Sequence, residues 1–282
     1  MGIHLPNIIS SSSNGGRGRP QASYLPPPSQ SPLPPLYGQQ QQPFQHQQEM
    51  PQPRPGSNSL YQPFYLTPEP LDLNVKLRLE VRNLGHAGAK VFFECVNPAV
   101  DLMWAVEEVF RWLYTPENFP RHVRSVTLYL EEMGGVAYTK GSELDDDHKE
   151  IHFSLQHIMN AKGKGKDGGR AEVLGVLVHE LVHCFQYNGK GTCPGGLVEG
   201  IADFVRLKAG LSAPHWKRGG NKWDDGYQTT GYFLDWIERK NTDFVRALNG
   251  TLSEHKYDER SFVNLTGRDV QTLWKEYKAT IV

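Results

Sequence analysis

The stretch Val173-Leu174-Gly175-Val176-Leu177-Val178-His179-Glu180-Leu181-Val182-His183-Cys184-Phe185-Gln186 carries the pattern His-Glu-x-x-His inside an apolar run of helical length. Residues four apart lie on one face of a helix, so His179 and His183 can direct their imidazoles at one metal ion. Glu180 stands beside the first histidine, where a carboxylate can take a proton from an attacking water. The spacing predicts a helix over residues 170–187 that carries two metal ligands and a general base.

A second pair of acidic residues follows in Glu199-Gly200-Ile201-Ala202-Asp203, within a helical pattern over residues 197–209. Catalytic zinc takes three protein ligands and keeps a fourth position open. Glu199 completes such a set with the two histidines, and Asp203, one turn further, can accept the spare ring N–H of His179. We therefore predict a hydrolytic Zn²⁺ site that holds its ion through His179, His183 and Glu199.

The remaining patterns predict an α+β fold in which strands come first and helices follow. In the N-terminal part of the folded region, alternating apolar and polar residues and short apolar runs predict a small mixed sheet with helices. The active-site helix follows, and the C-terminal part is predicted to be helical. The expected strands cover residues 75–81, 123–130, 136–138 and 150–155, and the expected helices cover 98–114, 170–187, 197–209, 227–239 and 270–277.

The N-terminal segment differs sharply in composition from the rest of the chain. Fifteen of the twenty prolines and eleven of the fifteen glutamines precede residue 71. Such a segment buries too little apolar surface to offset the entropy of ordering it. We expect a disordered Pro/Gln-rich tail over residues 1–70, serving as a solvated spacer or as a Pro-rich ligand for a partner, and one folded domain over residues 71–282.

Charge and hydropathy limit the classes of partner. The formal net charge is −1 and no basic stripe stands out, so we expect no nucleic-acid binding. No apolar run reaches the length of a membrane span, so we expect no membrane partner. We also expect the protein to be a monomer. The first residues have no basic start and only a short apolar run, which argues against a signal peptide and for a cytoplasmic protein.

Cysteines and an acidic loop offer two weaker signals. Cys184 and Cys193 bracket a short loop and could pair under oxidising conditions, but with Cys95 they form no disulfide framework, and we favour free thiols. The acidic run over residues 143–148 matches no calcium-loop spacing, so a solvated turn is the simpler interpretation.

The motifs together resemble those of a known family. The sequence Glu199-Gly200-Ile201-Ala202-Asp203 after His-Glu-x-x-His resembles the gluzincin metallopeptidases. More closely, residues 75–280 resemble the basic secretory protein family of plant and fungal peptidases. The matching pieces are residues 178–186, 194–200, 202–208, 223–227 and 233–235. The resemblance implies a zincin-like fold, hydrolysis of peptide bonds and secretion.

Tyr227, in the matched piece Trp223-Asp224-Asp225-Gly226-Tyr227, is our candidate for a second donor to the oxyanion, with Tyr232 or His215 as substitutes. Its alternative role is packing over the core. The strand over residues 151–155 can bind an extended peptide if it lies at a sheet edge, as zincin edge strands do by resemblance, or it is internal.

The site leads to two functional hypotheses from different classes. The first is a zinc-dependent peptidase, most simply an endopeptidase, in which Glu180 deprotonates a zinc-activated water and returns the proton to the leaving amine. The second is a zinc-binding defence or interaction protein whose peptidase activity has lapsed. Aminopeptidase action would require a group that holds the free amine of the substrate, and no such motif precedes the helix.

Overall fold

The computed structural model describes residues 75–164 and 167–281. Within these residues a small mixed sheet and nine helices form an α+β fold, as predicted. The strands are β1 (Lys76–Val81), β2 (Ser125–Glu131), β3 (Ala137–Gly141) and β4 (His148–Ser154). The helices are α1 (Ala87–Cys95), α2 (Pro98–Leu113), α3 (Leu155–Ala161), α4 (Arg170–Phe185), α5 (Gly195–Lys208), α6 (Tyr227–Glu238), α7 (Phe244–Glu254), α8 (Arg260–Thr266) and α9 (Val270–Ala279).

The sheet has the strand order β1-β2-β4-β3. The first three of these strands run parallel, and β3 pairs antiparallel with β4 at one edge. Alternation divides the sheet into two faces. Ile151 and Phe153 of β4 are fully buried on the helix side, whereas Tyr138 and Lys140 of β3 lie on the other, partly exposed face.

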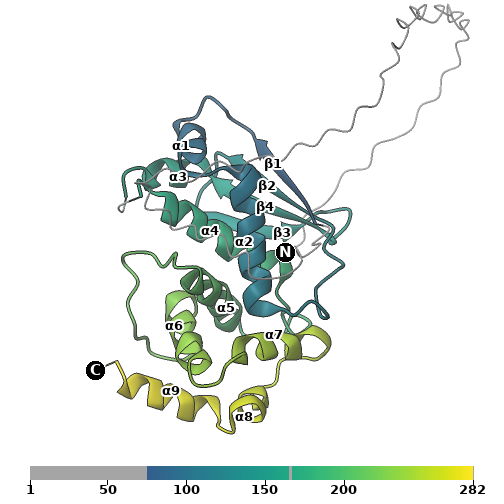
Figure 1. The fold of residues 1–282 in the computed structure, drawn as a ribbon, viewed down its shortest axis with the longest axis vertical. Coiled ribbons are helices and arrows are strands. Elements are labelled where there is room, and N and C mark those ends of the chain that lie inside the picture. Colours follow the sequence, from purple (N-terminus) through teal and green to yellow (C-terminus); the bar gives the residue numbers. More distant parts are fainter. Residues whose placement is uncertain (1–74, 165–166, 282) are drawn as a thin grey trace, which may run out of the picture. The chain divides into compact units, whose positions relative to one another are not determined.

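The helix α4 lies between the sheet and the C-terminal helices (Figure 1). It is apolar on nearly all sides, which is typical of a helix that is buried on all sides. Its first residue, Arg170, donates to both carboxylate oxygens of Asp101 near the start of α2, at 2.8 and 2.9 Å. At its last residue, the Tyr114 hydroxyl after α2 donates to the carbonyl of Phe185. Helix α2 therefore fixes α4 at both ends.

Helices α5 to α9 form a second layer on the far side of α4 (Figure 1). Two of them, α5 and α6, cross closely at glycines. A Cβ atom on Gly200 would lie 2.2 Å from Cγ2 of Thr230, and one on Gly231 would lie 3.2 Å from Cβ of Asp203. This close crossing fixes the position of α5, which carries the acidic residues of the predicted site.

The sequence predicted five of the nine helices and all four strands within a few residues. It missed α1, α3, α7 and α8. The proposal that residues 151–155 form a peptide-binding edge is wrong. Residues 151–154 belong to β4, which lies between β2 and β3, and Leu155 begins α3. The edge beside α4 is β3. The predicted tail over residues 1–70 lies outside the described residues.

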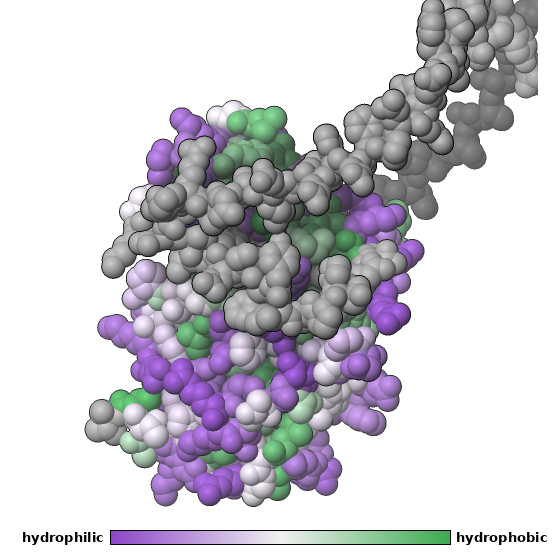
Figure 2. Space-filling model, viewed as in Figure 1, coloured by the Kyte–Doolittle hydropathy of each residue, from purple (hydrophilic) through white to green (hydrophobic). Residues whose placement is uncertain are grey.

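The visible, uncovered part of the surface in Figure 2 is mostly hydrophilic, with small, separate apolar patches over the C-terminal helices. Among the described residues, no helix combines the length and the apolar character needed to cross a membrane.

Candidate metal centre

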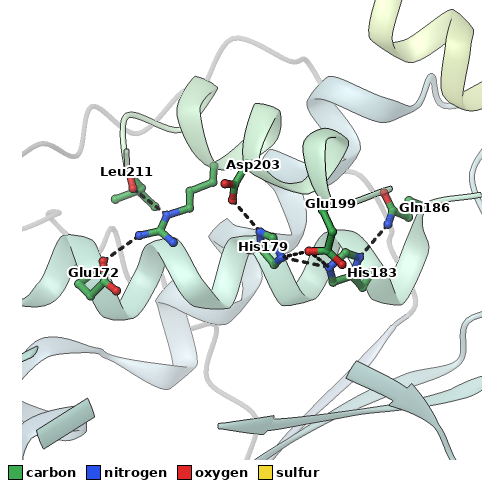
Figure 3. Close-up of polar contacts among 8 residues, drawn as sticks. Glu172, His179, His183, Gln186, Glu199, Asp203 and Leu211 are labelled. Atoms are coloured by element: carbon green, nitrogen blue, oxygen red, sulfur yellow. Dashed lines mark hydrogen bonds and ion pairs between the residues drawn. The ribbon is translucent and has the colours of Figure 1, made fainter. Parts of the chain in front are cut away.

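Helices α4 and α5 bring the three predicted ligands together (Figure 3). His179 and His183 lie one turn apart on α4, and their Nε2 atoms are 3.1 Å from each other. The Oε2 atom of Glu199, on the first half of α5, is 3.2 Å from Nε2 of His179 and 3.7 Å from Nε2 of His183. The ligand atoms of these three residues all lie within 4.8 Å of one another, close enough to share one ion.

Asp203 lies where the sequence predicted it. Its Oδ1 accepts the Nδ1–H of His179 at 2.7 Å, and the carboxylate is almost completely buried. This hydrogen bond fixes the ring so that Nε2, the atom facing Glu199, is the one available to a metal.

The charges of the cluster depend on one another. Burial lowers the pKa of His179, but hydrogen bonds to Asp203 and Glu199 outweigh it and raise that pKa to about 9. Burial raises the pKa of Glu199, whereas its hydrogen bonds with His179 and His183 lower it to about 2. Without a metal, these pKa shifts favour a protonated His179 beside an ionised Glu199, in the place that a divalent cation would take.

The residues fit a zinc ion in a further respect. If His183 ligates through Nε2, its Nδ1 carries a hydrogen and needs an acceptor. The side-chain amide of Gln186 lies against that Nδ1, 2.7 Å from it, while its buried Oε1 has no partner among the described residues. Turning the amide by half a rotation directs this oxygen to Nδ1–H, which satisfies both groups. Two imidazoles and a carboxylate are a donor set that zinc accepts.

Glu180 faces the same cavity as the three ligands, and β3 contributes the residue that holds it. The Thr139 hydroxyl contacts Oε2 of Glu180 at 2.7 Å and its backbone oxygen at 3.0 Å. The edge strand thus fixes the carboxylate that the sequence identified as the general base. Nothing in the local sequence indicates this contact, because the two residues are 41 positions apart.

Tyr227 lies at the start of α6, with its ring stacked on that of His179 at a centroid distance of 6.1 Å and an angle of 9°. Its φ of +44° is unusual for a tyrosine, and strained backbone of this kind clusters at functional sites. The negative charge of Glu199, with partial burial, raises the pKa of the Tyr227 hydroxyl. His215 also lines the cavity, whereas Tyr232 packs against the ring of Trp216 instead.

A cavity of about 860 Å³ contains the whole constellation. One wall is the edge strand β3 with residues 136–139, and the opposite wall is formed by α5 and the start of α6. Beyond the metal cluster the cavity continues along the first half of α4, where it is lined by Glu172 and Arg206. Sequence reasoning assigned neither residue to the site, although Arg206 lies in the matched piece 202–208.

The two weaker sequence signals have structural explanations. The described residues contain Cys95, Cys184 and Cys193 as free thiols. In the acidic run, Asp145 and Asp147 form ion pairs with Arg124, which fits the predicted solvated turn.

Comparison with known proteins adds the family. Searches of curated proteins and of solved structures gave no match. The family model BSP, described as a peptidase of plants and bacteria, matches residues 74–277, a range that includes every residue of the site. This range nearly coincides with the one that resembles the basic secretory protein family by its motifs. The chain therefore belongs to the BSP family of peptidases.

Proposed function

We propose that this peptidase is a zinc-dependent endopeptidase. The observation that carries the proposal is the convergence of His179, His183 and Glu199 beside a carboxylate, Glu180, that faces the same cavity. Zinc held by the three ligands would lower the pKa of a water molecule and polarise the carbonyl of the scissile bond. This chemistry requires a general base within reach of the water, and Glu180, which lines the same cavity as the three ligands, supports that role.

The chain's own residues supply the remaining steps. Glu180 accepts the proton of the attacking water and passes it to the nitrogen of the leaving amine. Thr139 holds the carboxylate in place for both transfers. Tyr227 would donate a hydrogen bond to the developing oxyanion, a role that the stacking of its ring on His179 supports.

The edge strand β3 provides a binding surface for an extended substrate. Ser154 donates its backbone N–H to the carbonyl of Val136, which identifies these two as a hydrogen-bonded pair of β3 and β4. Because such pairs alternate along an antiparallel ladder, Ala137 and Thr139 direct their backbone groups to the free edge. Because residues 136–139 line the same cavity as the three ligands, a peptide paired with this edge would pass the cluster, which would favour cleavage within a chain.

The experiment compares wild type with Glu180→Gln. We expect zinc-dependent cleavage of peptides blocked at both ends, and a loss of at least about a hundredfold in the variant, as is typical when a general base is removed. Zinc content, measured on both purified proteins, should be equal. Equal cleavage rates would refute the role of Glu180. Zinc binding without cleavage in wild type would favour the alternative of a zinc-binding protein with lapsed activity.

A further inference from the structure

The cavity has a second polar region beyond the metal cluster, centred on the guanidinium of Arg206. This side chain comes from α5, one turn after Asp203, and crosses to α4. It lines the cavity although the residue is only 7% exposed. Its two hydrogen-bond partners, Leu211 and Glu172, lie on the side of His179 away from His183 (Figure 3).

Four contacts fix the guanidinium. Its Nε donates to the carbonyl of Leu211 at 2.9 Å, and its Nη2 donates to Oε2 of Glu172 at 2.8 Å. Its Cζ lies 5.0 Å from the ring centre of Trp216. On the opposite side it lies against the backbone of α4, where a Cβ on Gly175 would come within 2.5 Å of Nε. The side chain is therefore rigid and pre-positioned.

The remaining donors of this group point to a ligand. A guanidinium carries five N–H groups, and the contacts with Leu211 and Glu172 use two of them. Among the described residues, Nη1 has no hydrogen-bond partner. Nη1 is not one of the fully buried side-chain atoms that lack a partner, so its two N–H groups are accessible from the cavity. A rigid pair of donors on a cavity wall favours a ligand that presents an acceptor oxygen.

The charges of Arg206 and Glu172 indicate which acceptor groups the ligand can carry. Glu172 is ionised, since the hydrogen bond from His157 and the charge of Arg206 outweigh the effect of burial and lower its pKa to about 2. The positive charge of Arg206 is thus already compensated. A neutral carboxamide can bind without leaving a buried charge, and a carboxylate gains a charge-assisted hydrogen bond.

We propose that this end of the cavity is a subsite for a substrate acyl group, a carboxamide or carboxylate, which accepts hydrogen bonds from Nη1 of Arg206. The inference rests on the proposed function, because it assumes that a peptide occupies the cavity. Glu172 lies seven residues before His179 on α4, about 10 Å along the axis. A long side chain such as that of glutamine or glutamate, on a residue beside the scissile bond, suits this distance better than a short one.

The test measures binding, so that it does not depend on turnover. Zinc-loaded Glu180→Gln protein is titrated with acetylated, amidated alanine peptides that contain one glutamine, glutamate or methionine. Methionine has nearly the shape of glutamine but no acceptor oxygen. We expect the glutamine or glutamate peptide to bind at least about tenfold more tightly than the methionine peptide, the usual value of a hydrogen bond to a charged donor. An alanine peptide with a free C-terminus, compared with its amide, shows whether a terminal carboxylate is the source of the acyl group.

Variants then attribute the preference to Arg206. In the Glu180→Gln background, Arg206→Met should bring the ratio of affinities to about one, and Arg206→Lys should restore part of it. A merely structural role would weaken all peptides equally and leave the ratio unchanged. Arg239→Met, at an exposed arginine that directly follows α6, is the matched control and should keep the wild-type ratio.

A second variant covers the case in which Arg206→Met does not fold. Gly175→Ala keeps every charge but displaces the guanidinium, and alanine is favourable in a helix. It should reduce the ratio as well. Equal binding of the glutamine, glutamate and methionine peptides, or a preference that survives in the folded Arg206→Met or Gly175→Ala protein, would overturn the subsite. Failure of zinc-dependent cleavage in wild type would overturn only the proposed function, because these affinities are measured without cleavage.

Discussion

Asp203 is a buried carboxylate that orients His179, one of the three proposed metal ligands. Its hydrogen bond to Nδ1 of His179 keeps the lone pair of Nε2 directed at the other two ligands. Asp203→Asn weakens this bond and can reverse its polarity. Changes of this kind usually cost ten- to a hundredfold in metal affinity. We expect that loss for zinc, measured by competition with a chelating dye. Asp235→Asn, an equally buried aspartate on α6, is the control and should leave zinc affinity unchanged.

The raised pKa of His179 makes zinc binding pH-dependent. In the metal-free protein this histidine is protonated up to a pKa of about 9, whereas zinc requires a free Nε2. Binding below pH 9 therefore releases a proton, and zinc affinity should rise as the pH rises from 6 to 9. Titration calorimetry at pH 7.5 in two buffers with different ionisation enthalpies measures the released proton directly. Release of no proton would show that His179 is neutral in the metal-free protein.

The raised pKa of His179 also makes the free energy of unfolding of the metal-free protein decrease as the pH rises. Because the folded pKa of His179 lies above its unfolded value of about 6.5, its contribution is complete at low pH and is lost as the pH rises toward 9. Glu199, with a pKa lowered to about 2, contributes above its ordinary range and loses that contribution only in strong acid. Zinc-free protein should therefore be less stable at pH 9.5 than at pH 6.

At the scale of residues, local spacing predicted the site residues that lie on the same helix face. It did not predict those that reach the cavity from distant parts of the sequence. His179, His183, Glu199 and Asp203 are separated by single helical turns within two helices, so the sequence alone places each pair on one face. Thr139 and Arg206 reach the cavity only through the packing of β3 and α5 against α4. No period in the sequence encodes that packing.

At the scale of elements, the crossing of α5 and α6 determines where the acidic ligand lies. Gly200, next to Glu199, contacts Thr230, a fully buried residue whose hydroxyl donates to the carbonyl of Trp223 at 2.7 Å. Gly200→Ala forces the two helices apart. We expect a loss of about 1–3 kcal/mol in the free energy of unfolding, the usual cost of overpacking, together with weaker zinc binding. Urea denaturation and dye competition measure the two effects.

Gly250 on α7 provides the matched control for that substitution. It also lies inside a helix, but a Cβ atom there would meet nothing within 4 Å. Gly250→Ala should therefore stabilise the fold by about 0.5–1 kcal/mol, because alanine loses less backbone entropy than glycine. If both variants shifted stability in the same direction, the close crossing would not be the cause.

Strong periodicity explains which elements the sequence predicts. The apolar stripe of α2 and the continuous apolar run of α4 identify these helices without any tertiary information. Helix α3 is short and follows β4 without a break, and α1 begins at glycines that suggest a turn. The order of the strands depends on long-range pairing: β4 inserts between β2 and β3, although β3 precedes it in the chain. For that reason the sequence leaves open whether β4 lies at the edge or inside the sheet, and the structure has it inside.

At the scale of the whole molecule, the site lies where two layers meet, and each layer is formed by a different part of the chain. His179 and His183 come from α4, which is fixed to α2 and the sheet, whereas Glu199 comes from α5 in the C-terminal layer. A metal ion between them would link the two layers. That residues 71–282 form one folded unit, with residues 1–70 as a separate tail, stays a prediction.

This arrangement predicts that zinc stabilises the full chain as well as completing its site. A ligand that binds only the folded state, at a free concentration a thousandfold above its dissociation constant, adds about 4 kcal/mol to the free energy of unfolding. For a domain of this size that corresponds to a Tm increase of about 10 °C. We expect a decrease of this order when a chelator removes the metal, measured by calorimetry, and recovery when zinc is restored. Glu199→Gln, which lacks the ligand from α5, should show a smaller response to the chelator. An equal response would mean that the metal stabilises the protein without joining the two layers.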